Sequence, residues 1–163
     1  MQRDGVPQVV RLAEDAGHGC DAILVSANAD LQRLAQRDLQ AVPDRFADAG
    51  PMGGIDALAA ACATPWLLTL PVDVVAAYER LLHMLMRAGD DGAVAEDDDG
   101  LQPLVALYRV DPLRHALASA ITAGEYSVQA MQASLKLPRV RFTGVRFGNL
   151  NTPDDLRAAG IDP

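Results

Sequence analysis

The sequence predicts an α/β fold in which helices cover a mostly parallel β-sheet. Between residues 21 and 88, short apolar segments of strand length alternate with segments of helical periodicity, and the connections between them are short. This alternation favours parallel strands joined by crossover helices. At 163 residues, half of them hydrophobic, the chain is long enough for one domain with a real core and short for two. We therefore expect residues 1–163 to form a single domain.

The first elements are expected near the N-terminus. Pro7 suits the first turn of a helix, residues 9–13 give that helix an apolar face, and Gly17 is a stop signal. A strand, a short helix and a second short strand are expected next, over residues 21–25, 29–36 and 39–42. Polar residues follow both strands, Asn28 after the first and Asp44 after the second.

The stretch from Gly50 to Asp73 carries the clearest pattern in the chain. Gly50-Pro51 and the Gly53-Gly54 pair have the composition of a tight loop. A helix is expected after this loop, and Pro65 stops it. Residues 66–70 are almost all apolar, which predicts a short strand buried on both faces.

The second half of the chain continues the mixture of helices and strands. The expected elements are a helix over 74–88, strands over 92–95 and 102–108, helices over 111–123 and 127–135, and an edge strand over 139–142. The acidic run over residues 96–100 is typical of a solvated loop tip. Near the C-terminus, Asn149 and Asn151 are either turn formers or amides that face a ligand.

Three polar side chains follow predicted strands, and they form the candidate site. Right-handed crossovers bring the carboxyl ends of parallel strands to one edge, so Asn28, Asp44 and Asp73 should line one rim. A carboxylate there could hold Mg²⁺, which takes oxygen ligands and bridges to phosphates. The competing interpretation is that Asp73 caps the following helix, a common role for an aspartate before a helix.

Composition excludes several classes of function. The net charge of −8 argues against a protein that neutralises nucleic-acid phosphate, although Arg139, Arg141 and Arg146 leave a local basic patch open. Cys20 and Cys62 have no metal-ligand spacing, so a reducing cytoplasm is expected. The longest uncharged apolar run is too short for a membrane span, and no signal peptide is expected.

Six separated motifs together carry a resemblance to a known family. They are Ser26-Ala27-Asn28, Val42-Pro43-Asp44, Gly50-Pro51-Met52-Gly53-Gly54-Ile55, Leu70-Pro71-Val72-Asp73, Gln102-Pro103-Leu104-Val105-Ala106-Leu107 and Gly148-Asn149-Leu150-Asn151-Thr152-Pro153. In this order they resemble the molybdenum cofactor guanylyltransferase family over nearly the whole chain. The resemblance implies a Rossmann-like, three-layer α/β/α nucleotidyltransferase fold.

The resemblance also implies a reaction. An enzyme of this family transfers GMP from Mg-GTP to the terminal phosphate of molybdopterin and releases pyrophosphate. By resemblance, Asn28 and Asp44 would contact the guanine nucleotide, Gly50 and Pro51 would form a wall beside it, and Asp73 would hold Mg²⁺ as the catalytic metal ligand. Asn149 and Asn151 would lie on the acceptor side. Such transfer depends on positioning and charge neutralisation more than on a protein nucleophile.

One departure from the family is large. Family members begin with a strand and a glycine-rich loop, followed by an arginine and a lysine, and this loop cradles the triphosphate. Nothing before Gly17 fits that pattern, and the first lysine is Lys136. The family's first strand lies mid-sheet, between the strands near Ile23 and Leu68. Its absence would leave those strands roughly 9–10 Å apart.

Two hypotheses from different classes follow. In the first, the protein is a guanylyltransferase whose 163-residue form is impaired because it lacks the phosphate-binding loop, and Met1 is an internal methionine. In the second, it is a catalytically inactive relative that binds or scaffolds molybdenum-cofactor assembly, with molybdoenzyme assembly proteins as partners. Transfer of CMP instead of GMP is a lesser alternative. For the sheet, we expect a rearrangement that closes the gap, or a gap filled by a partner in a homo-oligomer.

Overall fold

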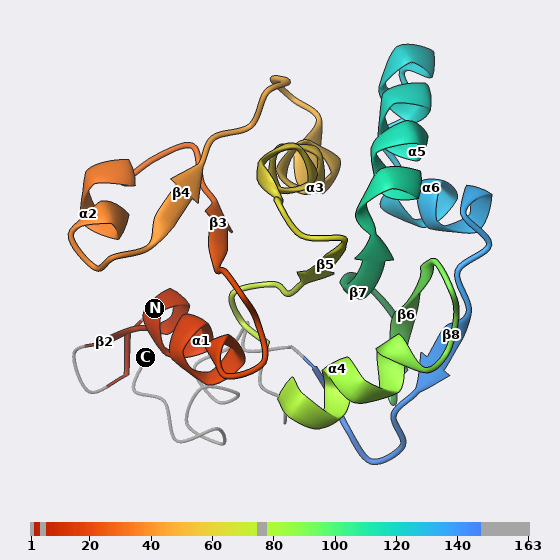
Figure 1. The fold of residues 1–163 in the computed structure, drawn as a ribbon, viewed down its shortest axis with the longest axis horizontal. Helices are drawn as coiled ribbons and strands as arrows, with labels where there is room; N and C mark the ends of the chain where they lie inside the picture. Colours follow the sequence, from red (N-terminus) through yellow and green to blue (C-terminus); the bar gives the residue numbers. More distant parts are fainter. Residues whose placement is uncertain (1, 4–5, 75–77, 148–163) are drawn as a thin grey trace.

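The structure is a computed structural model that describes residues 2–3, 6–74 and 78–147. Helices lie on both faces of a central sheet, which gives three layers (Figure 1). One face is covered by α3 (Gly50–Ala61), α5 (Val110–Ala123) and α6 (Val128–Ser134), and the other by α1 (Gln8–Gly17) and α4 (Tyr78–Met86). The α/β prediction is therefore confirmed.

The largest sheet has four strands in the order β5-β7-β6-β8. These are β5 (Trp66–Thr69), β7 (Gly100–Arg109), β6 (Gly92–Asp97) and β8 (Arg139–Arg141). β7 runs antiparallel to both of its neighbours, and β8 is parallel to β6, so every strand except β7 points the same way. β8 lies at the edge of the sheet, as predicted.

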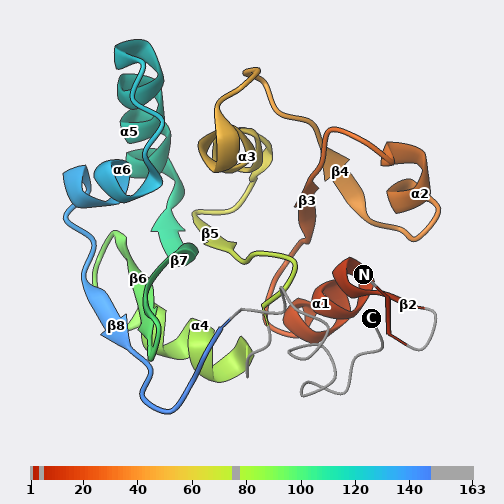
Figure 2. The same cartoon turned by 180° about the vertical axis from the view of Figure 1, so that it is seen from behind.

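Two smaller sheets come from the N-terminal part of the chain. β3 (Leu24–Ser26) and β4 (Gln40–Val42) pair in parallel, with α2 (Leu31–Ala35) between them in sequence. β1 (Gln2–Arg3) and β2 (Val6–Pro7) form a short antiparallel pair that the sequence does not predict. β3 does not pair with β5, and in both views it lies beside β5 (Figures 1 and 2).

The core lies on both faces of the central strands. Side chains of β7 alternate between the two faces, so Tyr108 packs with α3, α5 and α6 while Leu107 packs on the α4 side. Burial raises the pKa of the Tyr108 phenol to about 12, although hydrogen bonds with Gln132 and Thr69 oppose the shift. α5 ends where predicted, because Gly124 adopts φ +72 just after it.

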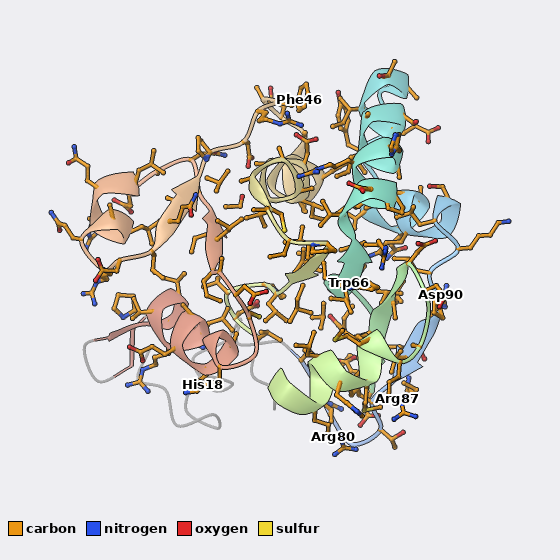
Figure 3. The ribbon with its side chains drawn as sticks, viewed as in Figure 1. His18, Phe46, Trp66, Arg80, Arg87 and Asp90 are labelled. Carbon is orange, nitrogen blue, oxygen red and sulfur yellow. The ribbon has the colours of Figure 1, made fainter. Side chains whose placement is uncertain are left out.

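Burial of β5 differs from the sequence prediction. Leu67 and Thr69 are buried, whereas Trp66 and Leu68 are half-buried, so the strand is not covered equally on both faces. Trp66 lies near the centre of the molecule (Figure 3), with the Arg109 guanidinium 5.3 Å from its ring centre. The cover is incomplete because a cleft opens on that side, lined in part by Trp66 and Leu68.

The prediction that residues 96–100 form a solvated loop tip was right for Asp98 and Asp99, which make the exposed turn between β6 and β7, and wrong for Glu96 and Asp97, which belong to β6. Asp97 is fully buried, and its carboxylate accepts hydrogen bonds from the backbone N–H of Phe147 (2.7 Å), the Gln102 side-chain amide (3.0 Å) and the backbone N–H of Asp99 (2.9 Å). Burial would raise the pKa of Asp97, but these hydrogen bonds and one from Gly100 outweigh it, and the net pKa lies below the ordinary value.

The neighbouring acidic residues neutralise the arginines that suggested a basic patch. Glu96 pairs with Arg141 at 2.9 Å and with Arg139 at 3.9 Å. Asp98 pairs with Arg141 at 3.3 Å, and Asp99 with Arg146 at 3.6 Å. The three arginines are therefore each paired with carboxylates and do not form a free cationic surface.

In the described part of the chain, no helix combines the length and apolarity needed to cross a bilayer.

Candidate functional site

The carboxyl ends of β3 and β4 meet at one rim, as the parallel prediction requires. The register pairs Ser26 with Val42, and the backbone N–H of Ala27 donates to the carbonyl of Val42 at 3.1 Å. Asn28 and Asp44, each two residues beyond its strand, therefore emerge side by side.

Asn28 and Asp44 are locked together by reciprocal hydrogen bonds. The Asn28 side-chain amide donates to Asp44 Oδ2 at 2.9 Å, and the Asp44 backbone N–H donates back to Asn28 Oδ1 at 2.8 Å. The Ser26 hydroxyl donates to Asp44 Oδ1 at 3.2 Å. These contacts fix the Asp44 carboxylate, whose remaining lone pairs can accept further donors.

The first turn of α3 packs against this network. An added Cβ on Gly54 would lie 2.7 Å from Ser26 Oγ, and one on Gly53 would lie 3.3 Å from Asp44 Oδ2. Only residues without a side chain allow the helix backbone to come so close. Because the macrodipole is positive at the start of a helix, the N-terminal end of α3 also favours the Asp44 carboxylate.

The loop predicted over Gly50 to Gly54 was wrong. α3 already begins at Gly50, with Pro51 in the first turn, where its missing N–H costs nothing. Only Gly50 has the turn conformation that the composition suggested, with φ +55. The two later glycines serve close packing inside a helix, which turn statistics do not distinguish from a loop.

Asp73 stands apart from the Asn28–Asp44 pair. It lies in a turn after β5, in which the Val74 N–H donates to the Pro71 carbonyl at 3.1 Å. Its half-buried carboxylate makes no hydrogen bond or ion pair with another residue of the described part, Asn28 and Asp44 included. The prediction that Asn28, Asp44 and Asp73 line one rim is therefore confirmed for Asn28 and Asp44. The capping interpretation concerns residues 75–77, which lie outside the described residues.

A cleft of about 720 Å³ lies between β3 and β5. Ser26, Asp44, Gly50 and Pro51 line part of it, and Pro71 and Val72, just before Asp73, line another. Most of the remaining lining is apolar, with α1 and α3 contributing side chains. The sheet has therefore not closed the gap by pairing β3 with β5. Two arrangements of the sheet were expected, a closed gap and an open gap, and the structure has the open gap.

Asn149 and Asn151 lie outside the described residues, so their predicted acceptor-side role stays a prediction. The structure does describe how the chain approaches them. The Asp97 carboxylate holds the Phe147 N–H, and the Phe147 ring packs edge-on against Phe142 with centroids 5.0 Å apart.

Two features were missed at the sequence level. The sequence motif contains Ser26, but its hydrogen bond to Asp44 was not predicted. The available signal was the position of Ser26 at the end of the strand.

Arg45 makes two hydrogen bonds of 2.8 Å to the buried carboxylate of Asp56, and these hydrogen bonds raise the pKa of the arginine. The Arg45 guanidinium also lies 5.7 Å from the ring centre of Phe46, and Phe46 lies at the outer end of the loop before α3 (Figure 3). In the described residues no three His, Cys, Asp or Glu side chains cluster to hold a metal.

Several solved structures share this fold. Molybdopterin-guanine dinucleotide biosynthesis protein A from Archaeoglobus fulgidus superposes with a TM-score of 0.69 at 21% identity, covering 98% of this chain and 86% of that one. The 2-C-methyl-D-erythritol 4-phosphate cytidylyltransferase from Thermus thermophilus gives a TM-score of 0.72 at 15% identity, covering 97% and 89%. The fold is therefore the Rossmann-like nucleotidyltransferase fold that the resemblance implied.

Sequence comparison narrows this to a family. The molybdenum cofactor guanylyltransferase of Cereibacter sphaeroides is 34% identical over 160 residues, covering 95% of this chain and 82% of that protein. The molybdenum cofactor guanylyltransferase of Cupriavidus necator is 32% identical over 163 residues, covering 91% and 78%. The family model for the MobA-like NTP transferase domain matches residues 1–138. The chain belongs to the MobA-like NTP transferase family.

Proposed function

We propose that this protein transfers GMP from Mg-GTP to molybdopterin, which forms molybdopterin guanine dinucleotide and releases pyrophosphate. The observation that carries the proposal is the Asn28–Asp44 pair, fixed by hydrogen bonds of 2.9 and 2.8 Å at the carboxyl ends of two parallel strands. Ligands in open α/β sheets bind at such ends. Family membership supports the reaction class, since relatives of more than 30% identity are guanylyltransferases by name.

In the proposed reaction, a terminal phosphate oxygen of molybdopterin attacks the α-phosphorus of GTP. The bond from that phosphorus to the α,β-bridging oxygen breaks, and pyrophosphate leaves with the electron pair. Asn28 and Asp44 bind the guanine nucleotide through an amide and a carboxylate whose orientation is already fixed. Gly50 and Pro51 form the wall beside it, and Asn149 and Asn151 bind the acceptor.

The residue that would hold Mg²⁺ is Asp73. Its carboxylate is free of ion pairs within the described residues, and it follows Pro71 and Val72 on the wall of the cleft. One carboxylate suits Mg²⁺, which keeps several waters and takes further oxygens from substrate phosphates. When bound, the ion neutralises charge that develops on the phosphates.

We expect residues 1–163 alone to transfer GMP slowly or not at all. In the described part of the chain, the cleft between β3 and β5 has mostly apolar walls and no glycine-rich backbone cradle for a triphosphate. Nucleotide binding by residues 1–163 can therefore be measured separately from GMP transfer. A protein that binds nucleotide and never transfers GMP would be the binding or scaffold protein of the alternative hypothesis.

The metal role is tested with Asp73→Asn, which keeps the shape of the side chain and removes its charge. Calorimetric titration with GTP should show that Mg²⁺ strengthens binding to the wild type at least tenfold more than to Asp73→Asn. The matched control is Asp111→Asn, at an exposed carboxylate on α5. Equal Mg²⁺ dependence in all three proteins would contradict the assignment of Asp73. A preference for CTP over GTP in the same titrations would contradict guanylyl transfer.

A further inference from the structure

Arg45 follows Asp44 directly in the chain and binds α3 through its side chain. Its guanidinium donates from Nε to Asp56 Oδ2 and from Nη2 to Asp56 Oδ1, both at 2.8 Å. A two-pronged ion pair of this kind fixes the orientation of the two side chains as well as their distance. The Asp56 side chain is 7% exposed and the Arg45 side chain 54%, so a carboxylate inside the protein holds an arginine that comes from the surface.

The buried carboxylate of Asp56 depends on this arginine. Within the described residues, Arg45 supplies both its hydrogen bonds and its opposite charge. A buried carboxylate without donors is costly, so the folded state favours the position of Arg45 that satisfies it. The start of the loop before α3 is therefore tied to the helix.

The same face of α3 contacts Asp44 and Arg45. Asp56 lies three residues after Gly53, and residues with this spacing are neighbours on a helix surface. Gly53 approaches Asp44 so closely that an added Cβ would lie 3.3 Å from Asp44 Oδ2. Asp44 thus packs on the helix at Gly53, and the next residue of the loop is fixed to the helix one turn later.

The rest of the loop contributes little to its own position. Phe46, Ala47 and Asp48 are exposed, and Phe46 lies at the outer end of the loop (Figure 3). Ala49 is buried where the loop meets α3, and it holds that end. The Arg45–Asp56 pair and the hydrogen bonds of Asp44 together hold the other end.

Neither member of the pair lines the cleft between β3 and β5, although Asp44 does. Arg45 and Asp56 instead line a separate hollow of about 490 Å³ between α3 and α5. An effect of the pair on the cleft therefore passes through Asp44 and α3, and not through contact with a ligand.

We propose that Arg45 and Asp56 are positioning residues for the nucleotide site: their ion pair holds Asp44 against α3, so that Asp44 and Asn28 are fixed before a guanine nucleotide binds. A site that is already ordered loses less conformational freedom on binding, so loosening the pair lowers affinity without removing a ligand contact. The effect on nucleotide binding rests on the proposed function. The hold on Asp44 does not, and it can be measured without nucleotide.

The test replaces Arg45 by lysine, which keeps the charge beside Asp56 but lacks the planar fork. Backbone amide exchange is followed by NMR in the nucleotide-free protein. The Asp44 N–H, which donates to Asn28 Oδ1 at 2.8 Å, should exchange at least fivefold faster in Arg45→Lys, relative to the Leu107 N–H on the central strand β7. A general loss of stability would speed both amides and leave this ratio unchanged.

Arg114→Lys is the matched control. Arg114 also binds α3, but at its C-terminal end, where Nε donates to the Ala59 carbonyl and Nη2 to the Cys62 carbonyl, both at 2.9 Å. The relative exchange of Asp44 should change less than twofold in this variant. Asp56→Asn removes the charge of the other partner and should reproduce the Arg45→Lys result; if it fails to fold, Arg45→Lys still decides.

Calorimetric titration with Mg-GTP measures the consequence for the site. Arg45→Lys should weaken binding at least fivefold, and Arg114→Lys less than twofold. Three outcomes would overturn the proposal: unchanged relative exchange of Asp44 in Arg45→Lys, equal acceleration in Arg114→Lys, or faster exchange with unchanged GTP affinity. A wild type that binds no GTP would contradict the proposed function, and the exchange ratio would still decide whether the pair holds Asp44.

Discussion

A single buried carboxylate anchors the segment that leads to the C-terminal asparagines. Asp97 has no exposed surface, and its oxygens hold the N–H of Phe147 and the Gln102 side chain across the end of the β6–β7 hairpin. A carboxylate held by several donors inside the protein is stable there only because those donors compensate for lost hydration.

Replacing that carboxylate should be strongly destabilising. Asp97→Ala leaves the buried N–H of Phe147 and the Gln102 amide without their acceptor, so we expect the free energy of unfolding to fall by about 3 kcal/mol. Urea denaturation measures the loss. Asp98→Ala is the matched control, because Asp98 is partly exposed and pairs only with Arg141 among the described residues; its loss should stay below about 1 kcal/mol. Equal losses would show that Asp97 has no special structural role.

Asp97 should also make stability depend on pH in the acid range. Its pKa is lower in the folded protein than in the unfolded chain, so it stabilises the fold above its ordinary pKa of about 3.9. That contribution is lost as the pH falls through the folded pKa. Between pH 5 and 2, Asp97→Asn should therefore lose less stability than the wild type. Parallel profiles in urea denaturation would contradict the lowered pKa.

At the scale of elements, the packing of α3 on the β3–β4 rim decides the geometry of the site. Gly54→Ala places a Cβ 2.7 Å from Ser26 Oγ, so either the helix or Ser26 must move. We expect a loss of about 1–3 kcal/mol in unfolding free energy and weaker GTP binding. The double variant Gly54→Ala with Ser26→Gly removes the clash and should recover most of the stability. Additive losses in denaturation would mean that the helix does not press on Ser26.

The elements themselves were largely predictable from local patterns. Pro7, Gly17 and Gly124 mark helix ends that the structure confirms, and the helix after Ser127 begins with its hydroxyl accepting the Ala130 N–H at 3.2 Å. The prediction failed where a residue's role depends on a distant partner. Gly54 looked like a loop glycine because its neighbour Ser26 is far away in sequence. Asp97 looked solvated because its donor, Phe147, lies fifty residues further on.

For the whole molecule, strand pairing was the least predictable property. The parallel pairing of β3 and β4 follows from the strand–helix alternation, but whether β3 would pair with β5 depends on long-range sheet energetics. The candidate site was predicted in part: Asn28 and Asp44 were expected together and are together, whereas Asp73 makes no contact with them among the described interactions. Local sequence determines which residues follow strands, and the assembled sheet determines which of them meet.

The central claim is that the Asn28–Asp44 pair beside α3 binds a guanine nucleotide, and titration of ¹⁵N-labelled protein with Mg-GTP tests it most directly. We predict that the largest chemical-shift changes fall on the Asn28 side-chain amide and on the backbone amides of Asp44 and Gly54. Asn28→Ala should weaken this binding at least tenfold, because it removes both the donor to Asp44 Oδ2 and the acceptor of the Asp44 N–H. Saturable shifts confined to other parts of the molecule, or unchanged affinity in Asn28→Ala, would contradict the claim.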